Sequence, residues 1–430
     1  MQELSVFIEI QGNLCHIGDI TGEDYRMAEF KYSDKYLSMN ERKALSISLP
    51  LTETPFSSEK TRNFFEGLLP EGFSRTAVAN WIKVDENDYL TILSSLGREC
   101  LGAVKIVEKK SNDVDAKKST GIGYKILSVP QVKKLAAEGA TKSTEILVKT
   151  HLSLTGASGK VGLYYDDKKN KWYLPEGDAP STHIVKQSHV RLSQIVLNEQ
   201  LSQLTAKNLG IDVPESFIVN TGEGTDGEIL FATKRYDRVF DTGRYIDRFQ
   251  LPGRLHQEDF AQAMGIPSSK KYEKENSGYM RRMFDLVREN LSDPIAEGLK
   301  LWKLICFNFL IGNTDAHIKN YSLLYSDDMK RITLAPAYDI VCTRAYNLTN
   351  EMSFYIGNEI DIDRINRSTF AIASKDAGLS ERIALKIFDE VADGFEKALN
   401  DAVEVVAESG FESIGKLKNK IKKSSGYRNL

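Results

Sequence analysis

Asp315, Asn320 and Asp339 have residue types and a spacing that suit phosphoryl transfer. Asn320 stands five positions after Asp315, and Asp339 follows on a later segment. The catalytic loop of protein kinases has the same Asp-to-Asn spacing, and a further Asp completes its magnesium site. Phosphoryl transfer needs one carboxylate near the attacking hydroxyl, and Mg²⁺ prefers hard oxygen ligands. The pattern therefore predicts Asp315 as the base and Asn320 and Asp339 as the metal ligands.

The same three residues also suit a polar loop after a helix, in which Asn and Asp side chains hydrogen-bond to their own backbone. Short motifs match by chance, so the spacing alone leaves both interpretations open.

A small-residue loop, Leu154-Thr-Gly-Ala-Ser-Gly-Lys160, lies between two strand-like runs. Small residues let backbone N–H groups approach a phosphate, and Lys160 would add positive charge. The loop is not a Walker A motif, because Leu154 stands where a glycine is required and Val161 replaces the magnesium-binding Ser or Thr. A plain glycine hairpin is the alternative.

Two further segments suit nucleotide binding. Lys186 closes the run 183–186, where a lysine could reach phosphates as the β3 lysine of kinases does; an edge lysine extending to solvent is the alternative. The segment 233–238 leads toward a helical half, which is where a kinase has the hinge that binds adenine through backbone groups. An exposed charged strand end is the alternative there. Residues 222–227 formally fit G-x-G-x-x-G, but a strand follows them, so they predict a β-turn.

The elements that must position these residues change character along the chain. We expect a mixed α/β first half and a helical second half, divided as 1–110, a β-rich 122–252 and a helical catalytic part 253–430. The loop 108–123 separates the first two parts. Strands are expected over 5–10, 45–49, 152–154, 161–165, 172–174, 183–186, 216–220 and 229–236. Helices are expected over 61–69, 77–81, 88–96, 195–209, 258–264, 279–290, 295–311 and 379–409.

The bulk properties are those of a soluble globular protein. A chain of 430 residues is too long for one ordinary hydrophobic core. Its formal charge of −3 disfavours a nucleic-acid partner for the chain as a whole. The four cysteines are scattered, and Cys306 and Cys342 are expected to be core thiols. The N-terminus alternates like a strand and has no signal-peptide pattern, and no apolar run reaches membrane-spanning length. We expect a cytoplasmic protein without a membrane partner.

Together these segments resemble the HipA family, the bacterial serine/threonine kinases of type II toxin–antitoxin modules. The resemblance covers nearly the whole chain in the same order, and its longest motif is Gly-x-x-Asp-x-His-x-Lys-Asn at 312–320. The other matching segments are Ser46–Leu51, Asn63–Pro70, Gly97–Val104, Ser153–Lys160, Thr182–Lys186, Lys234–Arg238, Gln257–Asp259, Pro267–Tyr272 and Pro336–Asp339.

The resemblance implies a two-lobed, protein-kinase-like α+β fold, with a mixed α/β N-terminal lobe and a mostly helical C-terminal lobe. It implies that Asp315 is the catalytic proton acceptor and that Asn320 and Asp339 coordinate Mg²⁺. Ser153 matches the serine that family members autophosphorylate, which ejects the loop and switches the kinase off. The residues implied to contact ATP are Thr155, Gly156, Ala157, Ser158, Gly159, Lys160, Lys186, Lys234, Arg235, Tyr236, His317, Ile318, Lys319, Asn320, Tyr338 and Asp339.

The resemblance also implies partners. The activity would be that of a growth-arresting toxin, with an aminoacyl-tRNA synthetase of the glutamyl type as its protein substrate. A small helix-turn-helix antitoxin, similar to HipB, would restrain it, and operator DNA would be bound only through that antitoxin. The basic tail 416–423 could touch DNA phosphates, with a solvated terminal helix as the alternative.

One departure from the family concerns the small-residue loop. The family usually has Ala-Gly-Ala-Gln, then an acidic residue or proline, then Lys, whereas this chain has Thr155-Gly-Ala-Ser-Gly-Lys160. Gly159 should make the loop more mobile, and Ser158 is a competing phosphate acceptor. Lys234 also differs in charge from the acidic residue often found at the hinge.

Two other functions fit some of these residues. A catalytically silent co-repressor would use ATP only structurally, but the complete set of Asp315, Asn320 and Asp339 argues against it. A metal-dependent phosphohydrolase could use the same acids, but Lys186 and the hinge-like segment favour ATP.

Overall fold

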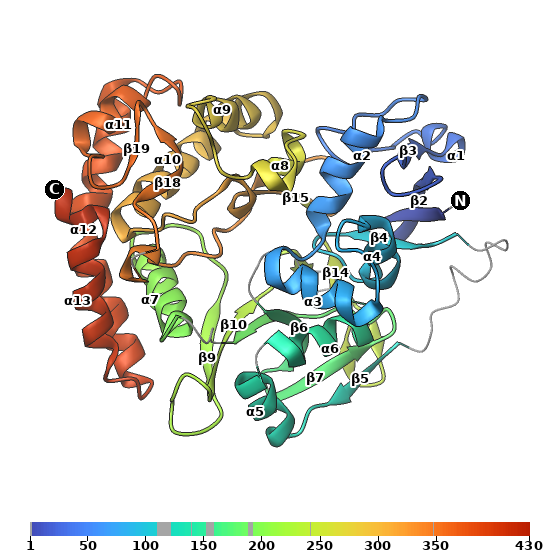
Figure 1. The fold of residues 1–430 in the computed structure, drawn as a ribbon, viewed down its shortest axis with the longest axis horizontal. Coiled ribbons are helices and arrows are strands. Elements are labelled where there is room, and N and C mark those ends of the chain that lie inside the picture. The colour runs from blue at the N-terminus through green and yellow to red at the C-terminus, as the bar shows by residue number, and fades with distance from the viewer. Residues whose placement is uncertain are drawn as a thin grey trace. The chain divides into compact units, whose positions relative to one another are not determined.

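The structure is a computed structural model that describes residues 2–109, 122–138, 140–151, 159–187, 192–240, 242–346 and 348–430. The chain folds into two compact units (Figure 1). The first comprises residues 1–187, 219–268 and 324–331, and the second comprises 188–218, 269–323 and 332–430. This is the α+β fold that the sequence predicts.

The first unit begins with an antiparallel sheet of order β3-β2-β1-β4. Its strands are β1 (Gln2–Ile10), β2 (Asn13–Gly22), β3 (Glu29–Tyr32) and β4 (Val104–Glu108). The helices of this part are α1 (Asp34–Leu37), α2 (Ser58–Phe65), α3 (Gly72–Ile82) and α4 (Tyr89–Leu96), with the 3₁₀ turn η1 (Glu66–Leu68). Leu4, Val6 and Ile8 of β1 are buried, so this strand lies in the core.

The second sheet has the order β5-β7-β6-β8-β10-β9 and carries the candidate phosphate-binding residues. Its strands are β5 (Gly123–Ile126), β6 (Lys160–Asp166), β7 (Lys171–Glu176), β8 (His183–Gln187), β9 (Ser216–Asn220) and β10 (Ile229–Lys234). Two helices that the sequence reasoning missed, α5 (Val129–Glu138) and α6 (Ala140–Thr150), precede β6 and lie beside this sheet (Figure 1).

Short elements follow the second sheet. They are β11 (Arg238–Val239), β12 (Tyr245–Ile246), β13 (Phe249–Gln250), β14 (Gly253–Arg254), β15 (Gln257–Asp259), α8 (Phe260–Ala263) and η2 (Ser268–Lys270).

The second unit is mostly helical. Its helices are α7 (Ile195–Asn208), α9 (Tyr279–Asn290), α10 (Pro294–Ile311), α11 (Arg367–Ala373), α12 (Glu381–Glu408) and α13 (Ile414–Ser424). Trp302, Phe309, Phe370 and Phe388 form an aromatic core between α10, α11 and α12, with ring centroids 4.6–6.4 Å apart. This core holds α10, and the segment 312–320 begins where α10 ends.

Strands and 3₁₀ turns complete the C-terminal part of the chain. They are η3 (Ile318–Asn320), β16 (Ser322–Tyr325), β17 (Ile332–Leu334), η4 (Thr343–Tyr346), β18 (Glu351–Ile356), β19 (Glu359–Asp361) and η5 (Gly426–Asn429).

Two predicted elements are wrong. Residues 45–49 form a turn with an isolated bridge between Ser46 and Leu49, because the Ser46 hydroxyl satisfies the backbone locally. The predicted helix 258–264 is reduced to α8, since residues 257–259 are strand β15 and Asp259 caps the helix by a capping box with Gln262. The predicted strand 152–154 lies outside the described residues.

Across the described parts of the chain, no helix combines the length and the apolar composition that crossing a membrane requires.

Candidate active site

Asp315 follows α10 and is an exposed residue in an otherwise buried segment. α10 ends at Gly312, whose φ of 79° turns the chain in a conformation that glycine adopts without strain. Asn313 then donates from Nδ2 to the Asn308 side chain at 3.0 Å, and its own oxygen accepts the Asp315 backbone N–H at 3.2 Å. Asn313 and Thr314 are each 2% exposed. The segment therefore has a fixed backbone and presents one carboxylate to solvent.

Residues 337–343 form a second segment that is anchored within the same unit. The Asn198 side chain on α7 bonds both backbone groups of Cys342, at 2.9 and 3.0 Å. The Thr343 hydroxyl accepts the Thr314 backbone N–H at 2.8 Å and donates to the Gly312 carbonyl at 3.1 Å. The second segment is thus bonded directly to the turn that carries Asp315.

Tyr338 joins the two segments at another point. Its hydroxyl donates to the Lys319 carbonyl at 2.8 Å and lies 2.6 Å from the Ser322 hydroxyl. Asn320 directly follows Lys319, and Asp339 directly follows Tyr338. The bond from Tyr338 therefore places the two predicted metal ligands on adjacent stretches of backbone.

Asn320 and Asp339 offer oxygen atoms suited to Mg²⁺. The Asn320 amide nitrogen donates to the Asp315 carbonyl at 2.9 Å, so the amide oxygen is the atom that can bind a metal. Asp339 has a φ of 57°, a conformation that Asp tolerates better than most residues and that gathers at functional sites. Among the described residues no three His, Cys, Asp or Glu side chains cluster as a metal site. A Mg²⁺ ion held by one amide and one carboxylate would complete its shell with phosphate oxygens and water.

The remaining residues of the 317–320 segment are largely buried. His317 and Lys319 are 7% and 5% exposed, and Ile318 is fully buried. The backbone N–H of Asn320 donates to the His317 carbonyl at 2.8 Å, which closes the turn η3. Ile318 would accordingly meet a nucleotide only through its backbone.

In the first unit, Lys186 lies on an interior strand and not at an edge. It pairs with Lys160 on β6 and with Phe231 on β10, and its ammonium lies 5.7 Å from the Phe231 ring centroid. Side chains of directly paired residues share one face of a sheet, where like charges repel. Two lysines in this arrangement favour the binding of an anion at that face, and a nucleotide phosphate is such an anion.

Gly159 is the one glycine of the small-residue loop that the structure describes. A Cβ atom at Gly159 would lie 1.9 Å from the amide nitrogen of Gln187, and Gln187 is itself bonded to the Ser143 hydroxyl at 3.0 Å. A larger residue at this position would have to displace the end of the Gln187 side chain. The other predicted loop residues, Ser153, Thr155, Gly156, Ala157 and Ser158, lie outside the described residues.

The hinge-like segment 234–236 is fixed by its arginine. The Arg235 backbone N–H donates to the Thr182 carbonyl at 2.9 Å, and its guanidinium binds both oxygens of Asp237 at 2.7 and 2.9 Å. Arg235 would therefore contribute to adenine binding only through its carbonyl. The Lys234 ammonium lies 5.4 Å from the Phe240 ring, and the Tyr236 hydroxyl is hydrogen-bonded to Gln257.

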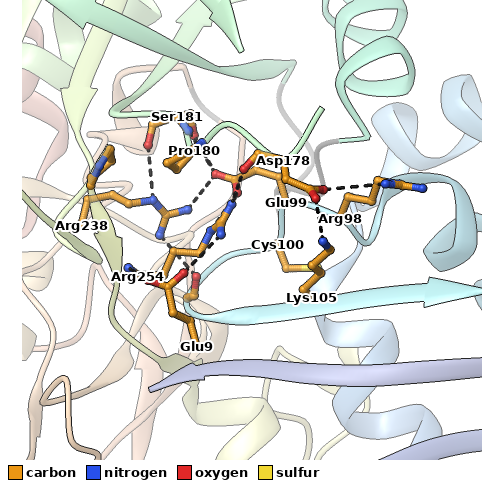
Figure 2. A network of polar contacts seen from close by, with 12 residues as sticks. Glu9, Arg98, Glu99, Cys100, Lys105, Asp178, Pro180, Ser181, Arg238 and Arg254 are labelled. Atoms are coloured by element: carbon orange, nitrogen blue, oxygen red, sulfur yellow. Dashed lines mark hydrogen bonds and ion pairs between the residues drawn. The ribbon is translucent and has the colours of Figure 1, made fainter. Parts of the chain in front are cut away.

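A buried charge network surrounds this hinge, and Figure 2 shows most of its residues. Glu99 accepts hydrogen bonds from Arg238 at 2.8 Å and from Arg254 at 2.6 Å, and Arg235 lies 3.3 Å away. Burial acts to raise the pKa of Glu99, but the guanidiniums of Arg254, Arg238 and Arg235 together hold it well below its ordinary range. Asp178 adds contacts to Lys105 and Arg98 at the edge of the network.

The sequence reasoning did not identify Glu99 or Tyr272 as partners of site residues. Tyr272 donates to Asp315 at 2.5 Å across 43 positions of sequence, and Glu99 meets Arg235 across 136. Both lie in segments that match the family, at 267–272 and 97–104, and that match was the available signal.

Comparisons with known proteins find similarity to one family along most of the chain. The family model of the HipA N-terminal domain matches residues 9–107. The family model of the HipA-like C-terminal domain matches residues 152–399. The chain is 29% identical over 408 residues to "Putative kinase Y4mE" of Sinorhizobium fredii, covering 91% of this chain and 92% of that protein. It is 27% identical over 381 residues to the "Serine/threonine-protein kinase toxin HipA" of Shewanella oneidensis, covering 84% and 81%.

A solved structure has the same fold. It is the Shewanella oneidensis toxin–antitoxin complex of HipA, HipB and operator DNA, and the TM-score is 0.77 at 23% identity. The match covers 98% of this chain and 97% of that one. This likeness concerns the fold and does not identify substrates.

Proposed function

The chain belongs to the HipA family of serine/threonine kinase toxins, and from this premise we propose that it transfers the γ-phosphate of ATP to a protein serine or threonine. The observation that supports this most is the pair of bonded segments in the second unit. The Tyr338 hydroxyl on the Lys319 carbonyl and the Thr343 hydroxyl on Gly312 gather Asp315, Asn320 and Asp339 on adjoining backbone.

In this proposal each residue has one role. Asp315 accepts the proton of the attacking hydroxyl, which its exposure allows. Asn320 and Asp339 hold Mg²⁺, which would neutralise the charge that develops on the phosphate oxygens when bound. Lys186 and Lys160 attract the ATP phosphates, and the 234–236 backbone binds adenine. The other predicted ATP contacts, Thr155 to Gly159, His317 to Lys319 and Tyr338, are proposed to line the same nucleotide.

The partners follow from the family. We propose a helix-turn-helix antitoxin similar to HipB, a toxin action in the cytoplasm, and an aminoacyl-tRNA synthetase as the protein substrate, with the glutamyl enzyme as the first candidate. Ser153 is proposed as a self-phosphorylation site, where a phosphate would add about −1.5 to −2 charge beside the charge of ATP.

Asp315→Ala and Asp339→Ala test the assigned roles. Both should lower the rate of ADP formation from Mg-ATP by about 100-fold or more, because positioning and charge neutralisation supply most of the catalysis. Asp339→Ala should also weaken Mg-ATP binding in calorimetry, whereas Asp315→Ala should leave it within about twofold. Wild-type turnover by purified Asp315→Ala would disprove its role as the base.

The substrate is identified by a second measurement. A phosphoproteome of cells expressing the wild-type chain, compared with cells expressing Asp315→Ala, reports each serine or threonine that depends on this kinase. Intact-mass and peptide mapping of the purified chain after incubation with Mg-ATP reports whether Ser153 carries phosphate.

A further inference from the structure

A tyrosine hydroxyl is hydrogen-bonded to the proposed catalytic base. The Tyr272 hydroxyl donates to Asp315 Oδ1 at 2.5 Å, and both residues belong to the second unit. The Tyr272 ring lies edge-to-face against the His317 ring, with centroids 5.3 Å apart and planes at 82°. Tyr272 is 43% exposed, so it stands at the surface of the site together with Asp315.

The residue after Tyr272 fixes its position. Glu273 is 5% exposed, and its two carboxylate oxygens accept the backbone N–H groups of Tyr279 at 3.0 Å and Tyr355 at 2.9 Å. The Glu273 backbone N–H donates to the Ser353 carbonyl at 2.8 Å. Three hydrogen bonds to one buried residue hold the neighbouring Tyr272 backbone in place, since hydrogen bonds to a charged group are strong and a buried charge is costly to release.

Strand β18, which carries Ser353, also holds the backbone beside Asp315. Ser353, on β18, donates from its hydroxyl to the Thr314 carbonyl at 2.8 Å. Ser353 therefore bonds to Glu273 through its backbone and to Thr314 through its side chain. These two residues directly adjoin Tyr272 and Asp315, so β18 sets the separation between the hydroxyl and the carboxylate.

We propose that Tyr272 is a positioning residue, which orients the Asp315 carboxylate toward the acceptor hydroxyl of the substrate; this inference rests on the proposed kinase function. An exposed Asp side chain has several rotamers open to it, and catalysis requires one of them. The bond from Tyr272 selects one orientation before the substrate arrives. A carboxylate accepts about four hydrogen bonds, so the bond from Tyr272 is compatible with a second one from the substrate.

The test separates orientation from binding and from folding. ADP formation from Mg-ATP is measured for the full chain, because it counts transfer to every acceptor, water included. Tyr272→Phe keeps the ring against His317 and removes only the hydroxyl. It should lower kcat about tenfold or more, since catalysis depends steeply on the position of the reacting groups, while the KM for ATP stays within about twofold and the melting temperature is unchanged.

Two companion variants make the result specific. Glu273→Gln weakens the hydrogen bonds that hold the backbone next to Tyr272 but keeps the Tyr272 hydroxyl. It should therefore also lower kcat, with little change in the KM for ATP. Tyr245→Phe removes the hydroxyl of a tyrosine that is 62% exposed in the first unit, and it should match the wild type.

The outcomes distinguish this inference from the function on which it rests. If the wild type forms ADP and Tyr272→Phe matches it, the positioning role is wrong and the kinase assignment stands. A higher kcat in Tyr272→Phe would mean that the hydroxyl blocks Asp315, which also overturns the inference. If the wild type forms no more ADP than Asp315→Ala, the proposed function itself fails.

Discussion

At the scale of single residues, the lysine pair on the second sheet gives a direct prediction. Lys186→Ala should weaken ATP binding at least tenfold, about 1.4 kcal/mol, because it removes one of two cations that share a sheet face with Lys160. Lys125→Ala changes an exposed lysine on the edge strand of the same sheet and serves as the control. Calorimetric titration with Mg-ATP measures both. Equal affinity of Lys186→Ala and the wild type would assign Lys186 to the fold alone.

Glu258 and His256 are both buried and lie two positions apart. Their protonation changes the stability of the protein with pH in opposite directions. Burial raises the pKa of Glu258 to about 7, against hydrogen bonds from Ser46 at 2.5 Å and Tyr325 at 2.5 Å. Burial lowers the pKa of His256 to about 4. Folding therefore takes up a proton at Glu258 between pH 4.5 and 7, so that its contribution to stability is lost as the pH rises through this window. His256 releases a proton on folding between pH 4 and 6.5, so its contribution increases over nearly the same window.

These opposite signs predict the behaviour of two single variants. Because the two effects offset each other, this pair should change the free energy of unfolding of the wild type little between pH 4.5 and 6.5. Glu258→Gln removes one slope, so its stability should increase with pH, by up to about 3 kcal/mol over the window. His256→Asn should show the reverse, a stability that decreases as the pH rises. Urea denaturation at several pH values measures both slopes, and parallel curves for the three proteins would contradict the assignment.

At the scale of elements, the charge network links the segment before β4 to the hinge-like segment 234–238 that follows β10. Glu99 bonds to Ser181 as well as to three arginines, which come from two different segments of the chain. Glu99→Gln would leave these buried arginines short of a countercharge. We expect it to lower the free energy of unfolding by about 3–5 kcal/mol, as measured by urea denaturation, because breaking a buried ion pair strands the remaining charge.

The control for Glu99→Gln is Glu108→Gln, at the exposed end of β4. It removes the same charge from the same part of the first unit and should change the free energy of unfolding by no more than about 0.5 kcal/mol. A loss below about 1 kcal/mol in Glu99→Gln would show that the network tolerates an amide and does not hold the segment 234–238 in place.

At the scale of the whole molecule, the charge balance bears on DNA binding. The net charge is −3, and the inner face of α13 is buried through Ile414, Leu417 and Ile421. Its Lys422 is paired with Glu396. We expect the chain alone not to shift operator DNA at about 150 mM salt, and to join the DNA only when the antitoxin is present.

A variant with Lys416→Ala and Lys423→Ala tests whether the tail contacts phosphates. If these exposed lysines touched DNA in the ternary complex, the salt dependence of binding would fall by about two units of slope. We expect the slope to stay unchanged in a gel-shift titration against salt. A lower slope would assign the tail to the DNA interface.

The sequence by itself determined several of the long helices and several strands of this protein, but not α5 and α6. The ranges 279–290, 295–311 and 379–409 correspond to α9, α10 and α12, because a helix is specified by apolar residues three and four positions apart and by local caps such as Ser380 and Asp293. The motif at 312–320 and the segment Pro336–Asp339 also gave Asp315, Asn320 and Asp339 without any structure, and the roles of these residues stay predictions.

Only the tertiary structure decided which distant residues meet. The bonds of Tyr272 to Asp315, Tyr338 to Lys319 and Glu99 to Arg238 join positions 19 to 139 residues apart. No local periodicity encodes such pairs, since they depend on how helices and strands pack. The same reason explains the failure at 45–49, where an alternating apolar pattern predicted a strand. Ser46 instead hydrogen-bonds to Glu258, 212 residues later, and the segment forms a turn.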